Sequence, residues 1–104
     1  LHNDTPVTPI SPLMDVFSAV NRLTSSGKVL GPDQRIGVME ALRGVTINGA
    51  YMQRLEDKIG SLEKGKLADM VILDKDPTKV DPVKLKDIMV EETIVGGNTV
   101  YKRA

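Results

Sequence analysis

Cysteine and tryptophan are absent from this sequence of 104 residues, and histidine occurs only once. Without cysteine the chain can form neither disulfides nor thiolate metal sites, a pattern that favours a cytoplasmic protein. Only Phe17, Tyr51 and Tyr101 are aromatic, and 14 basic residues balance 14 acidic ones without forming a block. The sequence therefore lacks the basic surface and the stacking platforms typical of nucleic-acid-binding proteins.

Long apolar runs are also lacking. No stretch approaches the roughly 20 apolar residues that cross a bilayer, and no signal-peptide pattern precedes His2. We therefore expect a soluble, untargeted chain with no membrane partner. The hydrophobic content of 40% suits one small domain with a modest core.

The first half of the chain carries helix signals. Ser11-Pro12 is typical of an N-cap followed by proline at the first helical position. The helix is predicted to end near residues 25–27, and its apolar stripe comprises Leu13, Val16, Phe17, Val20 and Leu23. A second helical stretch begins near Val38; its interruption by glycines at 44 and 49 predicts two short helices, the second capped by Thr46.

The pattern changes after residue 58 to β-branched runs separated by glycines. Four consecutive apolar residues, 70–73, predict a strand covered on both faces. Further strands are predicted at about 88–95 and 99–102, joined by a hairpin turn at Gly96-Gly97-Asn98, with one helical turn at 81–86 before them. The expected class is α+β, with a mostly helical region 1–58 and a β region 59–104.

Several segments carry a resemblance to a known family. IGSLEKGKLADMVILDKDP, residues 59–77, resembles the C-terminal signature of the amidohydrolase superfamily. HNDTPVTPISPL, GPDQRIGVMEALRGVTINGAY and DPVKLKDIMVEETIVGGNTVY are similar to amidohydrolase family 3, which includes N-substituted formamide deformylases and other metal-dependent hydrolases. The resemblance implies that residues 1–58 form the last strand end and the C-terminal helices of a (β/α)8 barrel. Residues 59–104 would then be the C-terminal part of a small, composite β-sandwich domain.

The same resemblance implies a role for the first residues. It puts Leu1 to Asp4 at the C-terminal end of the eighth barrel strand, on the face where barrel active sites lie. Asp4 is then expected to be the catalytic carboxylate beside the metal: it takes a proton from the metal-bound water and passes it to the leaving nitrogen. Strand alternation puts His2 on the same side and Asn3 on the other. Because the family's metal histidines lie on other strands, His2 is expected to line the pocket or to remain an exposed end.

The metal ligands implied by the resemblance are largely absent. A catalytic zinc site generally uses three protein ligands plus water, whereas His2 and Asp4 are the only candidates here. We therefore expect a C-terminal fragment of an amidohydrolase acting on amide-type C–N bonds, with zinc or a similar divalent metal in the intact parent, none in this chain, and no activity alone. Two alternatives stay open: a free-standing binding or regulatory module, and an oligomeric enzyme that combines His2 and Asp4 across an interface.

The expected partners are a small amide substrate, the missing barrel segment and further copies of the chain. Without a barrel to cover, the helical stripe that includes Val16 and Phe17 is expected to form an exposed apolar patch. With the unpaired strand edge at 70–73, this patch predicts a homo-oligomer. The acidic residues around Asp76 are expected to be solvated strand ends, because the spacing of a calcium loop is absent.

Overall fold

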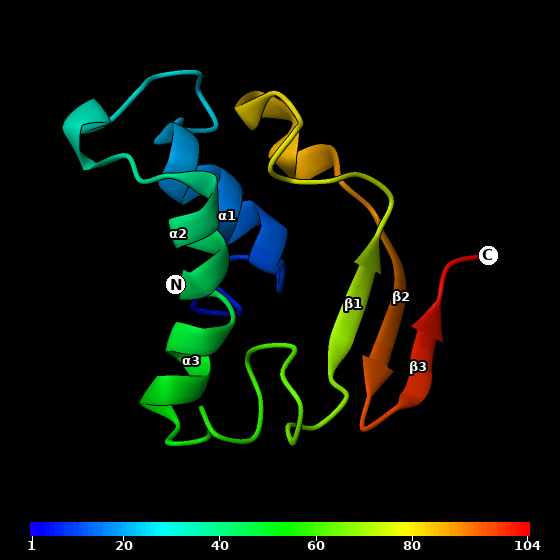
Figure 1. Cartoon of the computed structure of the whole chain (residues 1–104). Coiled ribbons are helices and arrows are strands. Elements are labelled where there is room, and N and C mark those ends of the chain that lie inside the picture. The colour runs from blue at the N-terminus through cyan, green and yellow to red at the C-terminus, as the bar shows by residue number, and fades with distance from the viewer.

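Helices occupy one side of the molecule and a three-stranded sheet the other (Figure 1). The structure is a computed structural model that describes residues 1–104. In chain order the elements are α1 (Pro12–Asn21), the 3₁₀ turn η1 (Pro32–Gln34), α2 (Val38–Gly44), α3 (Ile47–Met52), β1 (Met70–Leu73), the 3₁₀ helix η2 (Pro82–Asp87), β2 (Val90–Val95) and β3 (Asn98–Lys102). The α+β class is confirmed. None of the helices combines the length and the apolar character that a membrane crossing needs.

Helix α1 begins where the sequence predicts and ends earlier. The Ser11 hydroxyl accepts the Met14 N–H, and Pro12 follows it at the first helical position. Arg22 takes a left-handed conformation with φ 54° and ends the helix. Leu23 then forms a β-bridge with Val29, so the predicted extension to residues 25–27 is wrong.

Two short helices follow, as the glycine spacing predicts. Helix α2 ends at Gly44, and α3 begins at Ile47. The prediction that Thr46 caps α3 through its side chain is wrong. Its hydroxyl donates instead to the Leu42 carbonyl at 2.7 Å, so it closes the end of the preceding helix.

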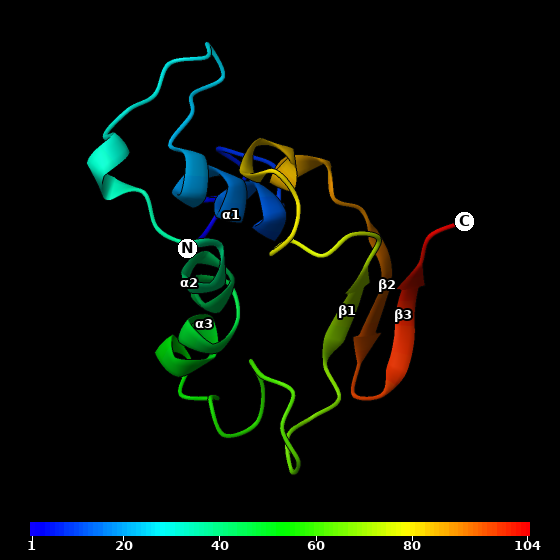
Figure 2. The same cartoon turned by 45° about the horizontal axis from the view of Figure 1, so that its top comes forward.

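The hydrophobic core lies where η2 and α2 both pack on α1, and both ribbon views show η2 beside α1 (Figures 1 and 2). Its buried members are Val16, Phe17, Ala41, Leu85 and Ile88. The predicted exposed patch on α1 is therefore wrong, because η2 covers the stripe and leaves Val16 fully buried. The packing of this core crosses residue 58, and the division of the chain at that residue stays a prediction.

The sheet is antiparallel, with β2 in the centre. Gly96 and Gly97, with φ values of 56° and 82°, form the predicted turn between β2 and β3. β2 begins at Val90 rather than at residue 88, because Ile88 follows η2 into the core. The prediction that β1 is covered on both faces is wrong for this chain: it pairs with β2 alone, and Val71 and Ile72 are about half exposed, at 54% and 46%.

Candidate functional site

The first four residues form no strand in this chain. Asp4 has a left-handed backbone, with φ 52°, and begins a turn in which the Val7 N–H donates to the Asp4 carbonyl at 2.9 Å. Aspartate is one of the few residues other than glycine that adopts this conformation with some frequency. Strand alternation therefore does not govern the side chains here, and the prediction that Asn3 lies on the side opposite His2 and Asp4 is wrong, because all three residues line one pocket.

Asn3 is the residue of this segment with the most side-chain hydrogen bonds to the rest of the chain. Its Nδ2 donates to the Ser11 carbonyl at 3.2 Å and to Asp15 Oδ1 at 2.8 Å. Its Oδ1 accepts the Ser11 N–H at 3.0 Å. The half-buried Asn3 side chain is thus tied to the start of α1.

His2 and Asp4 lie side by side, as the sequence predicts. The contact between them is a hydrogen bond from the backbone, which the sequence does not predict. His2 Nδ1 accepts the Asp4 backbone N–H at 3.1 Å. A nitrogen that accepts this bond carries no proton, so in neutral His2 the N–H is on Nε2. The exposed Asp4 carboxylate makes no hydrogen bond or ion pair within the chain, so its oxygens are free to accept a proton.

These side chains border a pocket of about 400 Å³ between the N-terminal loop and helices α1, α2 and α3. The residues that line it are Leu1, His2, Asn3, Asp4, Thr5, Ile10, Pro12, Asp15, Gly44, Val45 and Gly49. Gly44 lets the loop approach, because a Cβ there would lie 3.1 Å from the Leu1 side chain. One imidazole and two carboxylates therefore share a pocket, which is a combination suited to proton transfer.

Sequence reasoning missed two residues of this pocket, Asn3 and Asp15. No motif above includes Asp15, and no role in a pocket is predicted for it. The available signal was local, a carboxylate in the first turn after the Ser11 cap. Its pairing with Asn3, twelve residues away, depends on how the loop closes, which residue spacing alone does not specify.

The chain's own residues do not fit a catalytic metal. Nowhere does the structure bring together three or more histidine, cysteine, aspartate or glutamate side chains in a group that could hold an ion. In the candidate pocket, His2 Nδ1 is already engaged with the Asp4 backbone. A catalytic zinc site generally needs three protein ligands, so any metal at this pocket requires ligands from residues outside this chain.

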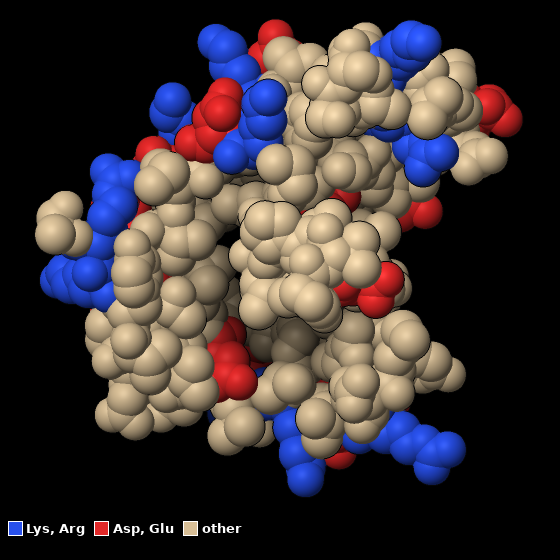
Figure 3. All heavy atoms as spheres, turned by 180° about the vertical axis from the view of Figure 1, so that it is seen from behind, with Lys and Arg blue, Asp and Glu red and all other residues tan.

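A larger hollow, of about 610 Å³, lies between α3, the loop after it and the sheet. Its lining is mainly apolar and includes Ala50, Ile59, Met70 and Ile94, with Asp69 as its only ionisable residue. Seen from behind, the lysine and arginine side chains visible on this face lie mainly along its edge, with uncharged atoms over much of the middle (Figure 3). This hollow lacks the paired ionisable groups that hydrolysis needs.

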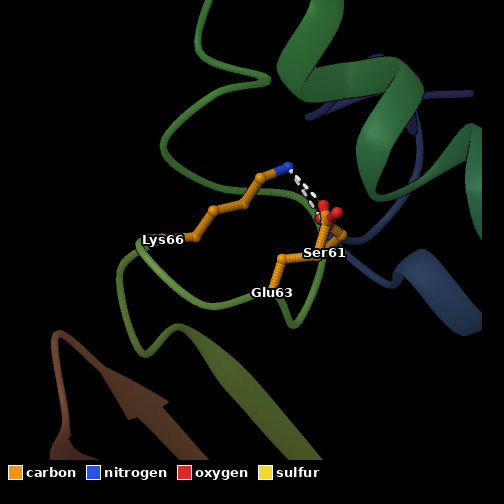
Figure 4. A network of polar contacts seen from close by, with 3 residues as sticks. All are labelled: Ser61, Glu63 and Lys66. Carbon is orange, nitrogen blue, oxygen red and sulfur yellow. Dashed lines mark hydrogen bonds and ion pairs between the residues drawn. The ribbon is translucent and has the colours of Figure 1, made fainter.

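A separate group of polar side chains consists of Ser61, Glu63 and Lys66 (Figure 4). Lys66 Nζ donates to Ser61 Oγ at 2.7 Å and pairs with Glu63 at 3.0 Å, while the serine hydroxyl donates to Glu63. The hydroxyl, followed by Lys66, holds the pKa of Glu63 below its usual range. A lysine that donates to the serine cannot accept its proton in that state. The three side chains therefore close the 61–66 loop and do not form an activated nucleophile.

Comparison with known proteins supplies the context for this geometry. The model of a family described as the amidohydrolase family matches residues 1–101. An N-substituted formamide deformylase from Arthrobacter pascens is 37% identical over 103 residues, which are 99% of this chain and 19% of that protein. The protein LONG AFTER FAR-RED 3 from Arabidopsis thaliana is 38% identical over 97% of this chain and 17% of its own length.

A solved structure agrees with these sequence matches. An amidohydrolase from Thermotoga maritima superimposes on 96% of this chain with a TM-score of 0.71 and 27% identity, and the match covers 22% of that protein. The chain therefore spans about a fifth of the length of the relatives it matches.

Proposed function

Because this chain belongs to the amidohydrolase family, we propose that it forms the C-terminal part of a metal-dependent hydrolase that cleaves amide-type C–N bonds. The proposed substrates are N-substituted formamides, the class named for the relative from Arthrobacter pascens. In this proposal the helices are the end of a (β/α)8 barrel, and the sheet belongs to the small β-sandwich beside it. The chain by itself is inactive.

One observation carries the proposal: the family match runs from residue 1 to residue 101 and so includes both the Asp4 pocket and the sheet. The chain spans only about a fifth of its relatives, and its residues do not assemble a metal site. Both facts are expected of a segment that carries one part of a larger active site.

Asp4 is the catalytic carboxylate in this proposal. Its oxygens face no partner within the chain and border the pocket. An ionised aspartate in that position accepts a proton from the attacking water as the new carbon–oxygen bond forms. It returns the proton to the nitrogen as the C–N bond breaks, which releases formate and an amine. His2 lines the pocket and offers Nε2–H as a donor, and residues outside this chain hold the metal.

A chimeric enzyme, called the graft below, tests this assignment. The 104 residues replace the matching segment of the Arthrobacter pascens deformylase, and release of formate from an N-substituted formamide is followed. We expect an active graft, because the exchanged segment matches over nearly its whole length. Asp4→Asn removes the proton acceptor and keeps the shape, and should lower kcat by about 10²- to 10⁴-fold.

The matched control is Asp57→Asn, which removes one exposed carboxylate that has no side-chain hydrogen bond in the structure. It should leave kcat unchanged. A folded, metal-loaded graft without deformylase activity would argue against the proposed reaction. An Asp4→Asn graft as active as the unsubstituted one would remove Asp4 from the chemistry.

A further inference from the structure

The backbone of Asp4 needs outside support. Aspartate adopts a left-handed conformation more readily than most residues, but the conformation still costs free energy that contacts around it must offset. Three hydrogen bonds surround Asp4: its N–H donates to His2, its carbonyl accepts from Val7, and the Thr8 hydroxyl donates to the Asn3 carbonyl. All three join residues within segment 2–8. They shape the segment but cannot fix its position on the rest of the molecule.

Two polar connections join the N-terminal loop, residues 1–10, to the rest of the chain. The first runs from the Leu1 amino group to the Gly44 carbonyl and is long, at 3.5 Å. The second is the Asn3 side chain, whose three bonds of 2.8 to 3.2 Å reach Ser11 and Asp15 at the start of α1. Asn3 is therefore the main polar attachment of this loop.

The chemistry of this attachment requires an amide. Ser11 presents both its N–H and its carbonyl to Asn3, so the side chain must accept and donate at once. The second Nδ2 proton goes to the Asp15 carboxylate, so every amide proton has an acceptor. An aspartate at position 3 could donate to neither group and would face Asp15 with a like charge.

We propose that Asn3 is the positioning residue for Asp4: it clamps the N-terminal loop to α1 and so fixes where the Asp4 carboxylate lies in the pocket. This inference rests on the proposed function of Asp4. Asn3 does not take part in proton transfer. Its loss lets the adjacent carboxylate move, and a misplacement of about 1 Å can lower a rate by about 10²-fold.

The first test measures kcat and KM in the graft described above. Asn3→Ala should lower kcat by about 10- to 100-fold per folded enzyme, with KM changed by less than about threefold, because the substrate contacts remain. Asp81→Ala is the matched control, since it also removes a hydrogen bond between a side chain and the backbone: at the remote η2, the Val83 N–H donates to Asp81 Oδ1. It should leave kcat unchanged.

Rescue separates positioning from general destabilisation. Asn3→Asp should lower kcat at least as much as Asn3→Ala, because it brings two carboxylates together. The added change Asp15→Asn restores one donor and one acceptor between positions 3 and 15, and should recover at least about tenfold of the loss. Equal kcat values for the single and double variants would contradict the proposed clamp.

Amide hydrogen exchange in the 104-residue chain gives a reading that needs no activity. Asn3→Ala should speed exchange of the Ser11 amide by about tenfold or more, because Asn3 Oδ1 accepts that proton. The Val45 amide, bonded to Ala41 in α2, is the internal reference. If the Ser11 amide of the unsubstituted chain already exchanges at the rate of an unfolded peptide, the clamp does not exist.

The outcomes distinguish the two claims. If Asp4→Asn leaves the graft active, the proposed role of Asp4 fails. If Asp4→Asn inactivates the graft while Asn3→Ala keeps full kcat, the role of Asp4 stands and the positioning role of Asn3 is overturned.

Discussion

The helical side and the sheet side of this chain are built in different ways. The seven buried residues all lie in or directly beside the helical elements: Val16, Phe17, Asn21, Ala41, Ala50, Leu85 and Ile88. The three strands contribute none, and every residue of β3 is exposed. Apolar burial therefore stabilises mainly the helical side. The sheet adds only partly buried apolar residues, such as Leu73, and depends more on its backbone hydrogen bonds and tight turns.

The difference also shows which side supports the candidate site. The Asp4 pocket is lined by the N-terminal loop and by residues of α1, α2 and α3, and by none of the sheet. Asn3 ties the loop to the start of α1, one turn before the buried Val16 and Phe17. Asp4 itself lies on an exposed loop, and Asn3 attaches this loop to the best-packed part of the chain, in agreement with the general demand for preorganised active sites.

The largest expected effect comes from emptying the core. Leu85→Ala removes a fully buried side chain that packs with α1, and should lower the free energy of unfolding by about 2–5 kcal/mol. The companion change Val100→Ala, in β3, shortens a side chain that is 62% exposed. It should change the free energy of unfolding by less than about 0.5 kcal/mol. Urea unfolding measures both. Similar losses from the two variants would contradict the contrast between the sides.

The connection between the two sides provides a smaller effect. Gly60 has φ 94°, and a Cβ there would lie 2.8 Å from Ala50 Cβ and 2.9 Å from Ile47 Cα. Gly65 has the same φ and open space around it. Alanine at either position has the same backbone strain. The extra loss in free energy of unfolding caused by Gly60→Ala, relative to Gly65→Ala, therefore measures the packing of the loop on α3. We expect an excess of about 1–3 kcal/mol in urea unfolding; no excess would mean that this contact is loose.

The third effect is smaller still: the stability of the fold should fall in acid because of two carboxyl groups in segment 59–81. Ser61 chiefly lowers the pKa of Glu63, and the Thr78 hydroxyl chiefly lowers that of Asp76. A carboxyl whose pKa is lower in the folded state stabilises the fold fully above about pH 5 and loses this effect as the pH falls below about 4. Glu63→Gln should therefore flatten the decline of the urea midpoint in acid.

Asp57→Asn is the control for this measurement, since Asp57 is also exposed and has no side-chain hydrogen bond in the structure. It should leave the shape of the pH dependence unchanged. A decline that is as steep in Glu63→Gln as in the unsubstituted chain would show that the Ser61–Glu63 bond does not contribute.

Local signals in the sequence were enough to predict most elements. Ser11-Pro12 starts α1, and Gly96-Gly97 forms the hairpin turn, because each depends on residues within one or two turns of chain. The packing of η2 on α1 was not predictable in this way. It joins residues more than sixty positions apart, as in the bond from Asn21 Nδ2 to the Pro82 carbonyl.

The candidate site shows the same division. The family resemblance points to Asp4, and strand alternation places His2 on the same side; in the structure both residues line one pocket. The prediction for Asn3 depends on a strand at residues 1–4, and in this structure these residues pair with no strand. The apolar run at 70–73 predicts a strand with neighbours on both faces; within this chain Val71 and Ile72 stay about half exposed, because the residues present do not cover them.

If Asp4 serves an active site whose metal is held by residues outside this chain, as proposed above, the chain alone should neither retain the metal nor hydrolyse the substrate. This can be measured as the zinc content of the purified 104-residue chain after dialysis, together with hydrolysis of an N-substituted formamide. We expect far less than one zinc per chain and no turnover above buffer. One tightly bound zinc per chain, lost on Asp4→Asn and accompanied by chelator-sensitive hydrolysis, would contradict this proposal.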